Sequence, residues 1–284
     1  MNLYLIHKGL SMKLHLIALH FFLFLSMNTF SAEKRIIVSG AAVAEVVSQL
    51  GEAANIIARD RTSVVVEEIA HLKDLGMPSQ MNAEVIISMK PDLFLYGSKN
   101  KNEKLVGQLN AAGIKSYEVR ESDSVKNILE KIDSVSSILD IDEDRVRKLK
   151  SEVESNLTKI SKLNKIKSKS AVFIYARGAN HIFMAGKKTP ANEMMNLIGI
   201  SNAFNEFDGF KPISLESLVK ANPDYIIMLK SGVRGLKNIW NIPGLKHTTA
   251  GKNKQLIETD TLPFLGFVPE TLPLIMSLNK SLSK

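Results

Sequence analysis

Few side chains in this chain of 284 residues have the type and spacing that catalysis requires. Ser39 or Ser63 could serve as a nucleophile, with Asp60 and His181 completing a hydrolytic triad in one cleft. No nucleophile elbow, phosphate loop or metal-ligand spacing surrounds these residues. We therefore expect a binding protein without catalytic residues, and an exported hydrolase is the less favoured alternative.

Metal-ligating side chains are also scarce. Beyond residue 32 the only histidines are His71, His181 and His247, and the chain has no cysteine at all. Such scattered histidines predict no zinc site, and we expect no resident metal or cofactor. Without cysteine, a disulfide, a thiolate site and a lipid-modified cysteine are all excluded.

A binding site between two lobes would be built from the loops that follow the strands, because ligands of α/β sheets lie beyond the strands' carboxyl ends. The expected loops are residues 39–42, 60–63, 76–80, 96–101, 177–181, 230–234 and 261–269. These loops have to be positioned by strands and helices in alternation.

Strand and helix patterns do alternate along the chain. Residues 35–38, an arginine followed by three apolar residues, predict a buried strand, and residues 43–50 carry valine and leucine at helical spacing before Gly51. Residues 56–58, 93–96 and 114–119 predict further strands, with helices after residue 82 and over 103–112. This alternation is typical of an α/β lobe with a mostly parallel sheet.

The second half of the chain repeats the first. Asn82-Ala83-Glu84 with Pro91-Asp92 matches Ser214-Leu215-Glu216 with Pro223-Asp224, and each pair is 132 positions apart. A second match, between residues 45–51 and 193–199, has the same order. Two related lobes explain both matches.

Residues 123–168 contain neither glycine nor proline and carry two apolar helical stripes. The expected fold is therefore α/β, with two Rossmann-like lobes of mostly parallel sheet joined by a single long helix. We expect a signal peptide over 1–32, an N-terminal lobe over 33–122, a connecting helix over 123–168 and a C-terminal lobe over 169–284. A helical connection predicts closure through a small angle.

The first 32 residues have the pattern of a secretory signal peptide. They contain Lys8 and Lys13 but no acidic residue, and their apolar run over 14–27 is shorter than the roughly 20 residues of a membrane span. Translation could start at Met1 or Met12, and cleavage could follow Ser31 or Ala32. Without a lipid anchor, an exported chain stays near the membrane if a second membrane retains it, so we expect a periplasmic protein. An uncleaved membrane anchor is the alternative.

Charge excludes one class of partner. The first 32 residues hold two of the 37 basic residues and none of the 29 acidic ones, which leaves a net charge of +6 beyond them. This mild excess suits an anionic ligand or membrane surface. It is too diffuse for nucleic acid, because aromatic and basic residues do not alternate.

Several motifs resemble the haemin-binding periplasmic proteins of ABC transporters, a branch of the group that also binds cobalamin and ferric siderophores. The resemblance rests on residues 35–40, 60–63, 75–76, 82–84, 90–92, 184–189, 209–214, 240–244 and 265–269. It implies two α/β lobes with haem, the transported ligand, held between them. It also implies an ABC permease dimer and its ATPase as partners, and we expect a monomer. Cobalamin or a ferric siderophore on the same scaffold is the alternative, as is a scaffold that has lost its ligand.

The haem branch usually has Gly-Tyr-x-Arg where this chain has Gly76-Met77-Pro78-Ser79. The resemblance therefore places Met77 at the iron ligand's position and Ser79 at that of a propionate-binding arginine. A thioether is a soft ligand that favours reduced iron, whereas phenolate favours ferric iron. Met77 could equally be a packing residue.

The C-terminal lobe could compensate for the missing tyrosine and arginine. His181 and Tyr175 are the further iron-ligand candidates, although a surface histidine and a core tyrosine are the plainer interpretations. Arg234 matches an Arg-Gly of the family and could hold a propionate through its guanidinium fork, and Arg177 could do the same. Phe264 and Phe267 could stack on a macrocycle or belong to the core.

Glu84 and Glu216 occupy matching places in the two halves. The resemblance implies that each forms a salt bridge with an arginine of one permease subunit. Two exposed carboxylates related by pseudo-symmetry can dock on a symmetric dimer. Acidic residues also favour a helix start on their own account.

Overall fold

The computed structural model describes residues 34–176, 181–236 and 238–283. Residues 35–284 form one compact unit. The predicted signal peptide, residues 1–32, and Arg177 lie outside the described residues. None of the helices within the described ranges has the length and apolar character needed to cross a bilayer.

The first sheet, with its helices, forms what we call the N-lobe. Its five strands are all parallel, in the order β3-β2-β1-β4-β5. They are β1 (Ile36–Ser39), β2 (Ile56–Arg59), β3 (Lys73–Asp74), β4 (Leu93–Gly97) and β5 (Lys115–Val119). The helices are α2 (Ala41–Val47), α3 (Ala83–Ser88), α4 (Glu103–Ala111) and α5 (Lys126–Leu139). Short helical turns are η1 (Ser48–Glu52), η2 (Ala53–Asn55), η3 (Arg61–Val65), η4 (Glu67–Ile69), η5 (Pro78–Gln80) and η6 (Ser98–Asn100).

The second sheet, with its helices, forms what we call the C-lobe. Its strand order is β11-β10-β6-β7-β9, with β8 also paired to β6. The strands are β6 (Ile166–Ala176), β7 (Ile182–Ala185), β8 (Ile200–Asn202), β9 (Phe210–Pro212), β10 (Tyr225–Leu229) and β11 (Leu256–Thr259). The helices are α7 (Pro190–Ile198), α8 (Leu215–Ala221), α9 (Lys230–Arg234), α10 (Thr249–Lys252), α11 (Thr261–Leu265) and α12 (Thr271–Leu282), with turns η7 (Ile239–Asn241) and η8 (Leu245–His247). Only the β6–β7 and β7–β9 pairs are antiparallel. The predicted mostly parallel α/β lobes are confirmed.

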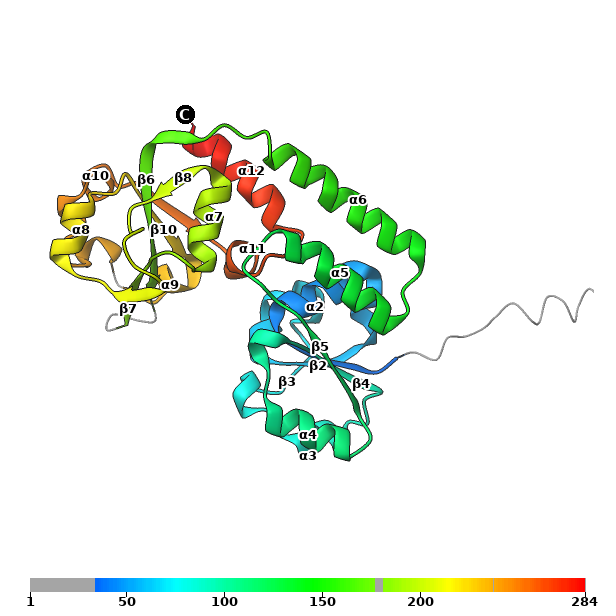
Figure 1. Ribbon diagram of the computed structural model, residues 1–284. Helices are drawn as coiled ribbons and strands as arrows, with labels where there is room; N and C mark the ends of the chain where they lie inside the picture. The colour runs from blue at the N-terminus through cyan, green and yellow to red at the C-terminus, as the bar shows by residue number, and fades with distance from the viewer. Residues whose placement is uncertain (1–33, 177–180, 237, 284) are drawn as a thin grey trace, which may run out of the picture. The chain divides into compact units, whose positions relative to one another are not determined.

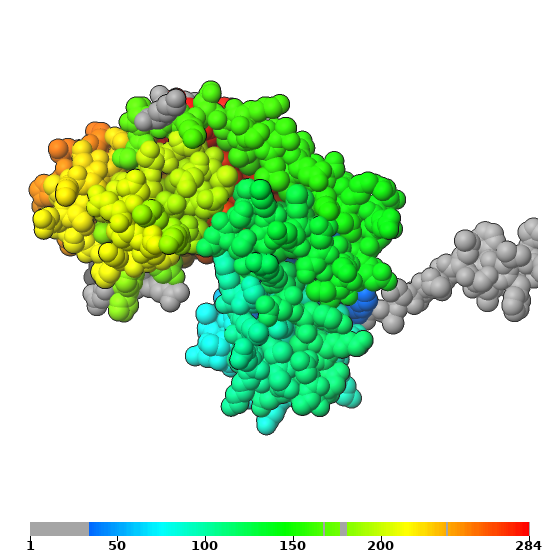
Figure 2. Space-filling model, in the orientation of Figure 1, coloured from blue at the N-terminus to red at the C-terminus, as the bar shows by residue number. Residues whose placement is uncertain are grey.

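One helix, α6 (Glu143–Ile160), connects the lobes, because it packs on η1 of the N-lobe and on α12 of the C-lobe. The chain breaks between α5 and α6 at Asp140, whose φ of 56° is left-handed. Asp142 then caps α6 by accepting hydrogen bonds from the amides of Asp144 and Arg145. Figure 2 shows the residues of α5 and α6, in green, on the surface of the molecule.

Helices cover both faces of each sheet (Figure 1). In the N-lobe, α3 and α4 pack together on one face, and α2 and α5 pack together on the other. The core beneath α2 and α5 continues through Val153 and Ile160 of α6 into the C-lobe, where α7 and α12 cover it. An apolar core therefore runs without interruption across the connection between the lobes.

The repeated Pro-Asp motif has the same structural role in both halves of the chain. Asp92 and Asp224, which follow the matching prolines, each accept a hydrogen bond of 2.8 Å from a backbone amide of the neighbouring strand's segment. The donors are Arg35, immediately before β1, and Ser170, within β6. Lys90 and Asn222, immediately before those prolines, both have positive φ, of 49° and 44°. The Pro-Asp element therefore ends a helix and ties the next strand to its neighbour in both lobes.

Candidate functional site

Both lobes contribute to a pocket of about 260 Å³ at the carboxyl ends of their strands, which we call the inter-lobe pocket. Its lining comes from α2 and η3 in the N-lobe and from α9, α11 and the ends of β11 and α12 in the C-lobe. The residues are Glu45, Val65, Lys230, Ser231, Arg234, Thr259, Asp260, Thr261, Leu262, Pro263 and Glu270. Three of the loops predicted from the sequence, those at 60–63, 230–234 and 261–269, supply these residues or end within two positions of them. Glu45, on α2, lies outside the predicted loops.

Arg234 is the one described ligand-binding candidate that lines the inter-lobe pocket. It is the last residue of the short helix α9, directly after β10, and its side chain is exposed. Lys230, one turn earlier, forms an ion pair of 2.7 Å with Asp260. The cationic end of the pocket is therefore Arg234, whose guanidinium is available to an anionic group of a ligand.

Apolar side chains of the N-lobe are exposed beside this pocket. Val65 lines it with 52% of its surface exposed, and the adjacent Val64 is 47% exposed. Both belong to η3, whose first turn is fixed by Asp60. Apolar surface in one pocket with a guanidinium that no described acidic residue pairs with suits a flat, amphipathic anion.

Met77 is also exposed, at 39%, in the loop after β3. The loop is held firmly, because Asp74 accepts a 2.7 Å hydrogen bond from the amide of Gly76, and the amide of Arg61 donates to the Gly76 carbonyl. The Gly76 hydrogen bond, together with Arg61, lowers the pKa of Asp74. Met77 is therefore presented to solvent rather than packed in the core, but it does not line the inter-lobe pocket.

Ser79 lies elsewhere. It lines a hollow of about 370 Å³ on the N-lobe, together with Glu84 and Asn102. Ser79 is thus grouped with the expected docking residue and not with Arg234. The expectation that Ser79 occupies the position of a propionate-binding arginine stays a prediction.

The two C-lobe candidates for iron binding differ in exposure. Tyr175, near the end of β6, is half-buried, and its ring lies 6.0 Å from that of the exposed Phe210. His181 is exposed and immediately precedes β7. Phe264 and Phe267 are fully buried, and the ring of Phe264 stacks on Phe173 at 5.3 Å. These two phenylalanines belong to the core, so they do not stack on a ligand.

The triad expected of a hydrolase is not assembled around Asp60. Its Oδ1 accepts hydrogen bonds from the Gly40 amide and the Ser63 hydroxyl, and its Oδ2 accepts from the amide and hydroxyl of Thr62. Asp60 is fully buried and caps η3, so its role is to fix the loop. Within the described ranges, no group of three or more acidic or histidine side chains could hold a metal ion.

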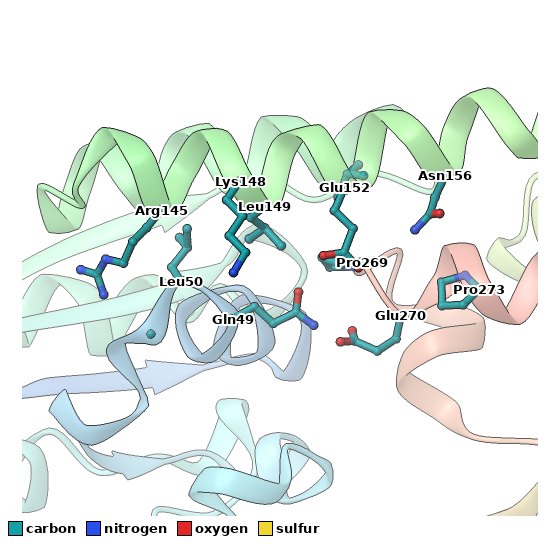
Figure 3. A pocket seen from close by; sticks show the side chains of 12 residues that line it. Gln49, Leu50, Arg145, Lys148, Leu149, Glu152, Asn156, Pro269, Glu270 and Pro273 are labelled. Atoms are coloured by element: carbon teal, nitrogen blue, oxygen red, sulfur yellow. The ribbon is translucent and has the colours of Figure 1, made fainter.

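A second pocket, of about 460 Å³, lies between α6, η1 and the start of α12, and we call it the α6 pocket. Figure 3 shows Lys148 and Glu152 of α6 reaching into it opposite Gln49 and Glu270. Glu270 lines both this pocket and the inter-lobe pocket. Burial, and then the nearby Glu45 carboxyl, raise the pKa of Glu270 to about 8. Glu45 and Glu270 could not be identified as pocket residues from the sequence, since neither lies in a site motif.

The proposed docking residues lie on equivalent helices. Glu84 is in the first turn of α3, capped by Asn82, and Glu216 is in the first turn of α8, capped by Ser214. Both side chains are exposed. Exposed apolar side chains accompany them: Val85 and Ile87 on α3, and Leu215 and Val219 on α8.

Comparison with known proteins agrees with this architecture. Residues 36–262 match the model of a family described as periplasmic binding protein. YvrC of Bacillus subtilis (strain 168), an uncharacterized ABC transporter substrate-binding lipoprotein, is 27% identical over 221 residues, 76% of this chain and 69% of that protein. YfmC of the same organism, an Fe(3+)-citrate-binding protein, is 23% identical over 235 residues, 80% of this chain and 73% of that protein. The periplasmic heme-binding protein RhuT from Roseiflexus sp. RS-1, in its apo form, superposes with a TM-score of 0.82 and 26% identity, covering 88% of this chain and 98% of that one.

Proposed function

Because this chain belongs to the periplasmic binding protein family, we propose that it is the solute-binding component of an ABC importer and carries haem between its lobes. The observation that carries the proposal is the inter-lobe pocket, which is lined both by the exposed side chain of Val65 and by Arg234, whose guanidinium has no acidic partner among the described residues. Haem has the matching chemistry, since it is a flat apolar ring with carboxylates at one edge. The likeness to a heme-binding protein supports this ligand.

In this arrangement Arg234 pairs with a propionate, and the macrocycle covers Val64 and Val65. The inter-lobe pocket is smaller than the roughly 300–1,000 Å³ of a typical ligand site. It therefore serves as the floor of the site, with Met77 and Phe210 as exposed apolar contacts further out. Met77 is the proposed iron ligand from the N-lobe, and Tyr175 or His181 the ligand from the C-lobe. Arg177 is the second proposed propionate partner.

Titration of the purified protein with haemin, in the ferric and then the ferrous state, tests this function through the Soret band. We expect tighter binding of ferrous haem, because a thioether favours reduced iron. Met77→Ala should remove the spectral shift of the ferrous complex, whereas Met89→Ala, in the same lobe, should leave it. Arg234→Ala should weaken binding about tenfold or more by removing a charge-assisted pair. Absence of any Soret change in both oxidation states would refute haem as the ligand.

A ferric chelate such as a siderophore, or cobalamin, is the second candidate on the same scaffold. It is favoured by the relative named for binding ferric citrate and by methionine at the position of the usual tyrosine. The fluorescence of Trp240 can report binding of ferric citrate or cobalamin. Such binding, without any binding of haemin, would establish this second function.

We further propose that Glu84 and Glu216 dock on the two halves of a permease dimer. Each carboxylate would pair with a basic residue of one subunit, while Ile87 and Val219, which are 132 positions apart, would add apolar contact at equivalent points. Charge reversal of both glutamates should leave ligand binding intact and abolish uptake in cells. Glu206→Lys, an equally exposed C-lobe glutamate, is the control and should transport normally. Uptake by the doubly reversed protein would exclude this docking mode.

The proposed location is the periplasm, reached through a cleaved signal peptide, with the protein working as a monomer. The mature protein should be found in the osmotic-shock fraction. Its amino-terminal sequence should begin at Ala32 or Glu33.

A further inference from the structure

Two carboxyl groups from different lobes meet at the boundary between the lobes. Glu45 projects from α2 of the N-lobe, and Glu270 lies at the start of α12 in the C-lobe. The side chains of the two are close enough to hydrogen bond, and both line the inter-lobe pocket. Oε2 of Glu270 is buried, and no amide, hydroxyl or cationic group among the described residues donates to it.

The two carboxyl groups can form a hydrogen bond only when one of them is protonated. Two ionised carboxylates in contact repel each other, whereas one shared proton makes a hydrogen bond between them. Oε1 of Glu45 already accepts a 2.8 Å hydrogen bond from the amide of Gln49, which leaves its other oxygen for Glu270. Figure 3 shows Gln49 and Glu270 pointing toward one another at the edge of the α6 pocket.

The surroundings favour the protonated pair. Further charged groups line the two pockets: Lys148 and Glu152 from α6, and Lys230, Arg234 and Asp260 from the C-lobe. Glu68 of η4 also acts on Glu270 through its charge. Lys230 is paired with Asp260, and Arg145 of α6 is paired with Glu52. The strongest charges acting on Glu270 are those of Glu45 and Glu68, and both oppose its ionisation.

We propose that Glu45 and Glu270 form a proton-operated latch between the lobes, closed while the pair holds a proton and released when both carboxyls ionise. The latch does not depend on which ligand the protein carries. Release would loosen the floor of the inter-lobe pocket, because both residues belong to its lining. Binding in acidic surroundings and discharge in alkaline ones would follow.

The pH range follows from linkage. When the lobes separate, Glu270 regains the ordinary pKa of 4.5, whereas in the closed form its pKa is about 8. Closed lobes therefore bind more protons between these values, so closure weakens as pH rises from 4.5 to 8 and is constant above that. If lobe closure is fully coupled to one proton, the equilibrium constant for closure changes tenfold for each pH unit. Partial exposure of Glu270 reduces the expected overall change in that constant to about three- to thirtyfold.

Distance measurement between spin labels tests the latch, and the absence of native cysteine makes site-specific labelling direct. Lys104→Cys on α4 and Lys252→Cys on α10 place one label on an exposed site of each lobe. In the ligand-free protein, the distance distribution should move toward the separated form between pH 5 and pH 8.5. Glu270→Gln keeps the shape without the titration, so it should remove this response.

Three further variants show whether the two carboxyls act as a pair. Glu45→Gln should remove the response as Glu270→Gln does, and the double variant should add nothing, whereas Glu154→Gln, on the exposed face of α6, should respond like the parent. Identical distributions of the parent at pH 5 and pH 8.5 would overturn the latch, and so would a pH response that survives both single substitutions. Neither result would bear on haem binding, which is measured separately.

Discussion

Lys131 provides a quantitative test of how the lobes are joined. It lies on α5, is 1% exposed, and donates a 2.9 Å hydrogen bond through Nζ to the carbonyl of Gly266 in the C-lobe. Burial lowers its pKa from 10.5 to about 8, against a smaller opposing effect of Glu121. The charged amine is therefore held at a cost in the folded protein.

The size of that cost follows from the pKa. One pKa unit corresponds to about 1.36 kcal/mol, so charged Lys131 destabilises the fold by about 3 kcal/mol relative to the neutral amine. The unfolded chain binds more protons than the folded one between pH 8 and 10.5, so stability should rise with pH in that window and the penalty is complete below pH 8.

Lys131→Met removes this titration while keeping a similar apolar stem. The variant should be about 2 kcal/mol more stable than the parent at pH 7, since the penalty of about 3 kcal/mol disappears and a hydrogen bond worth about 1 kcal/mol is lost. At pH 10.5 only the lost hydrogen bond remains, and the variant should be about 1 kcal/mol less stable. The difference between the two proteins thus changes sign with pH.

Urea unfolding followed by circular dichroism at pH 7, 8, 9 and 10 measures this difference, provided that the slope with denaturant is the same for both proteins. Lys126→Met, an exposed lysine of the same helix, is the control and should show a constant difference near zero. A difference for Lys131→Met that is the same at pH 7 and pH 10 would refute the reasoning.

Four substitutions test the packing of the two lobes by thermal or urea unfolding. Asp60→Ala removes the acceptor of four hydrogen bonds and should cost about 3 kcal/mol or more; a cost below 1 kcal/mol would contradict its role in fixing η3. Gly251→Ala places a Cβ 1.9 Å from the Leu245 carbonyl oxygen and should prevent normal folding, whereas Gly107→Ala, in open space within α4, should stabilise by about 0.5–1 kcal/mol. Equal behaviour of the two alanine variants would disprove the close approach. Asn279→Ala orphans the carbonyls of Asn164 and Ile198 and should cost about 2 kcal/mol, and an effect within 0.5 kcal/mol would mean that water replaces the amide.

The local pattern of the sequence was enough to predict the two lobes. The predicted strands at 93–96 and 114–119 and the predicted helices that begin at residues 83 and 103 agree with β4, β5, α3 and α4 to within a residue or two. Periodicity and proline report on backbone conformation, which neighbouring residues largely determine. The Pro-Asp repeat likewise marked a real structural unit, since the same aspartate contact recurs in both lobes.

The candidate site was predictable only in part. Arg234 was identified from a motif and lines the inter-lobe pocket. Ser79 was expected at the position of a propionate-binding arginine; it lines a hollow with Glu84, and its role in ligand binding stays a prediction. Position in a motif gives the loop on which a residue lies, but the direction of its side chain depends on the turn that carries it. Here Pro78 starts η5 and carries Ser79 into that hollow.

By itself, then, the sequence determined the α/β lobes, their internal repeat and the exposed glutamates at the start of α3 and α8. The contacts across the lobe boundary, Glu45 with Glu270 and Lys131 with Gly266, were decided by tertiary structure alone. These residues are far apart in the chain and carry no motif. Their chemistry arises because α6 and the continuous core bring two lobes together and exclude water from groups that would otherwise be ordinary surface charges.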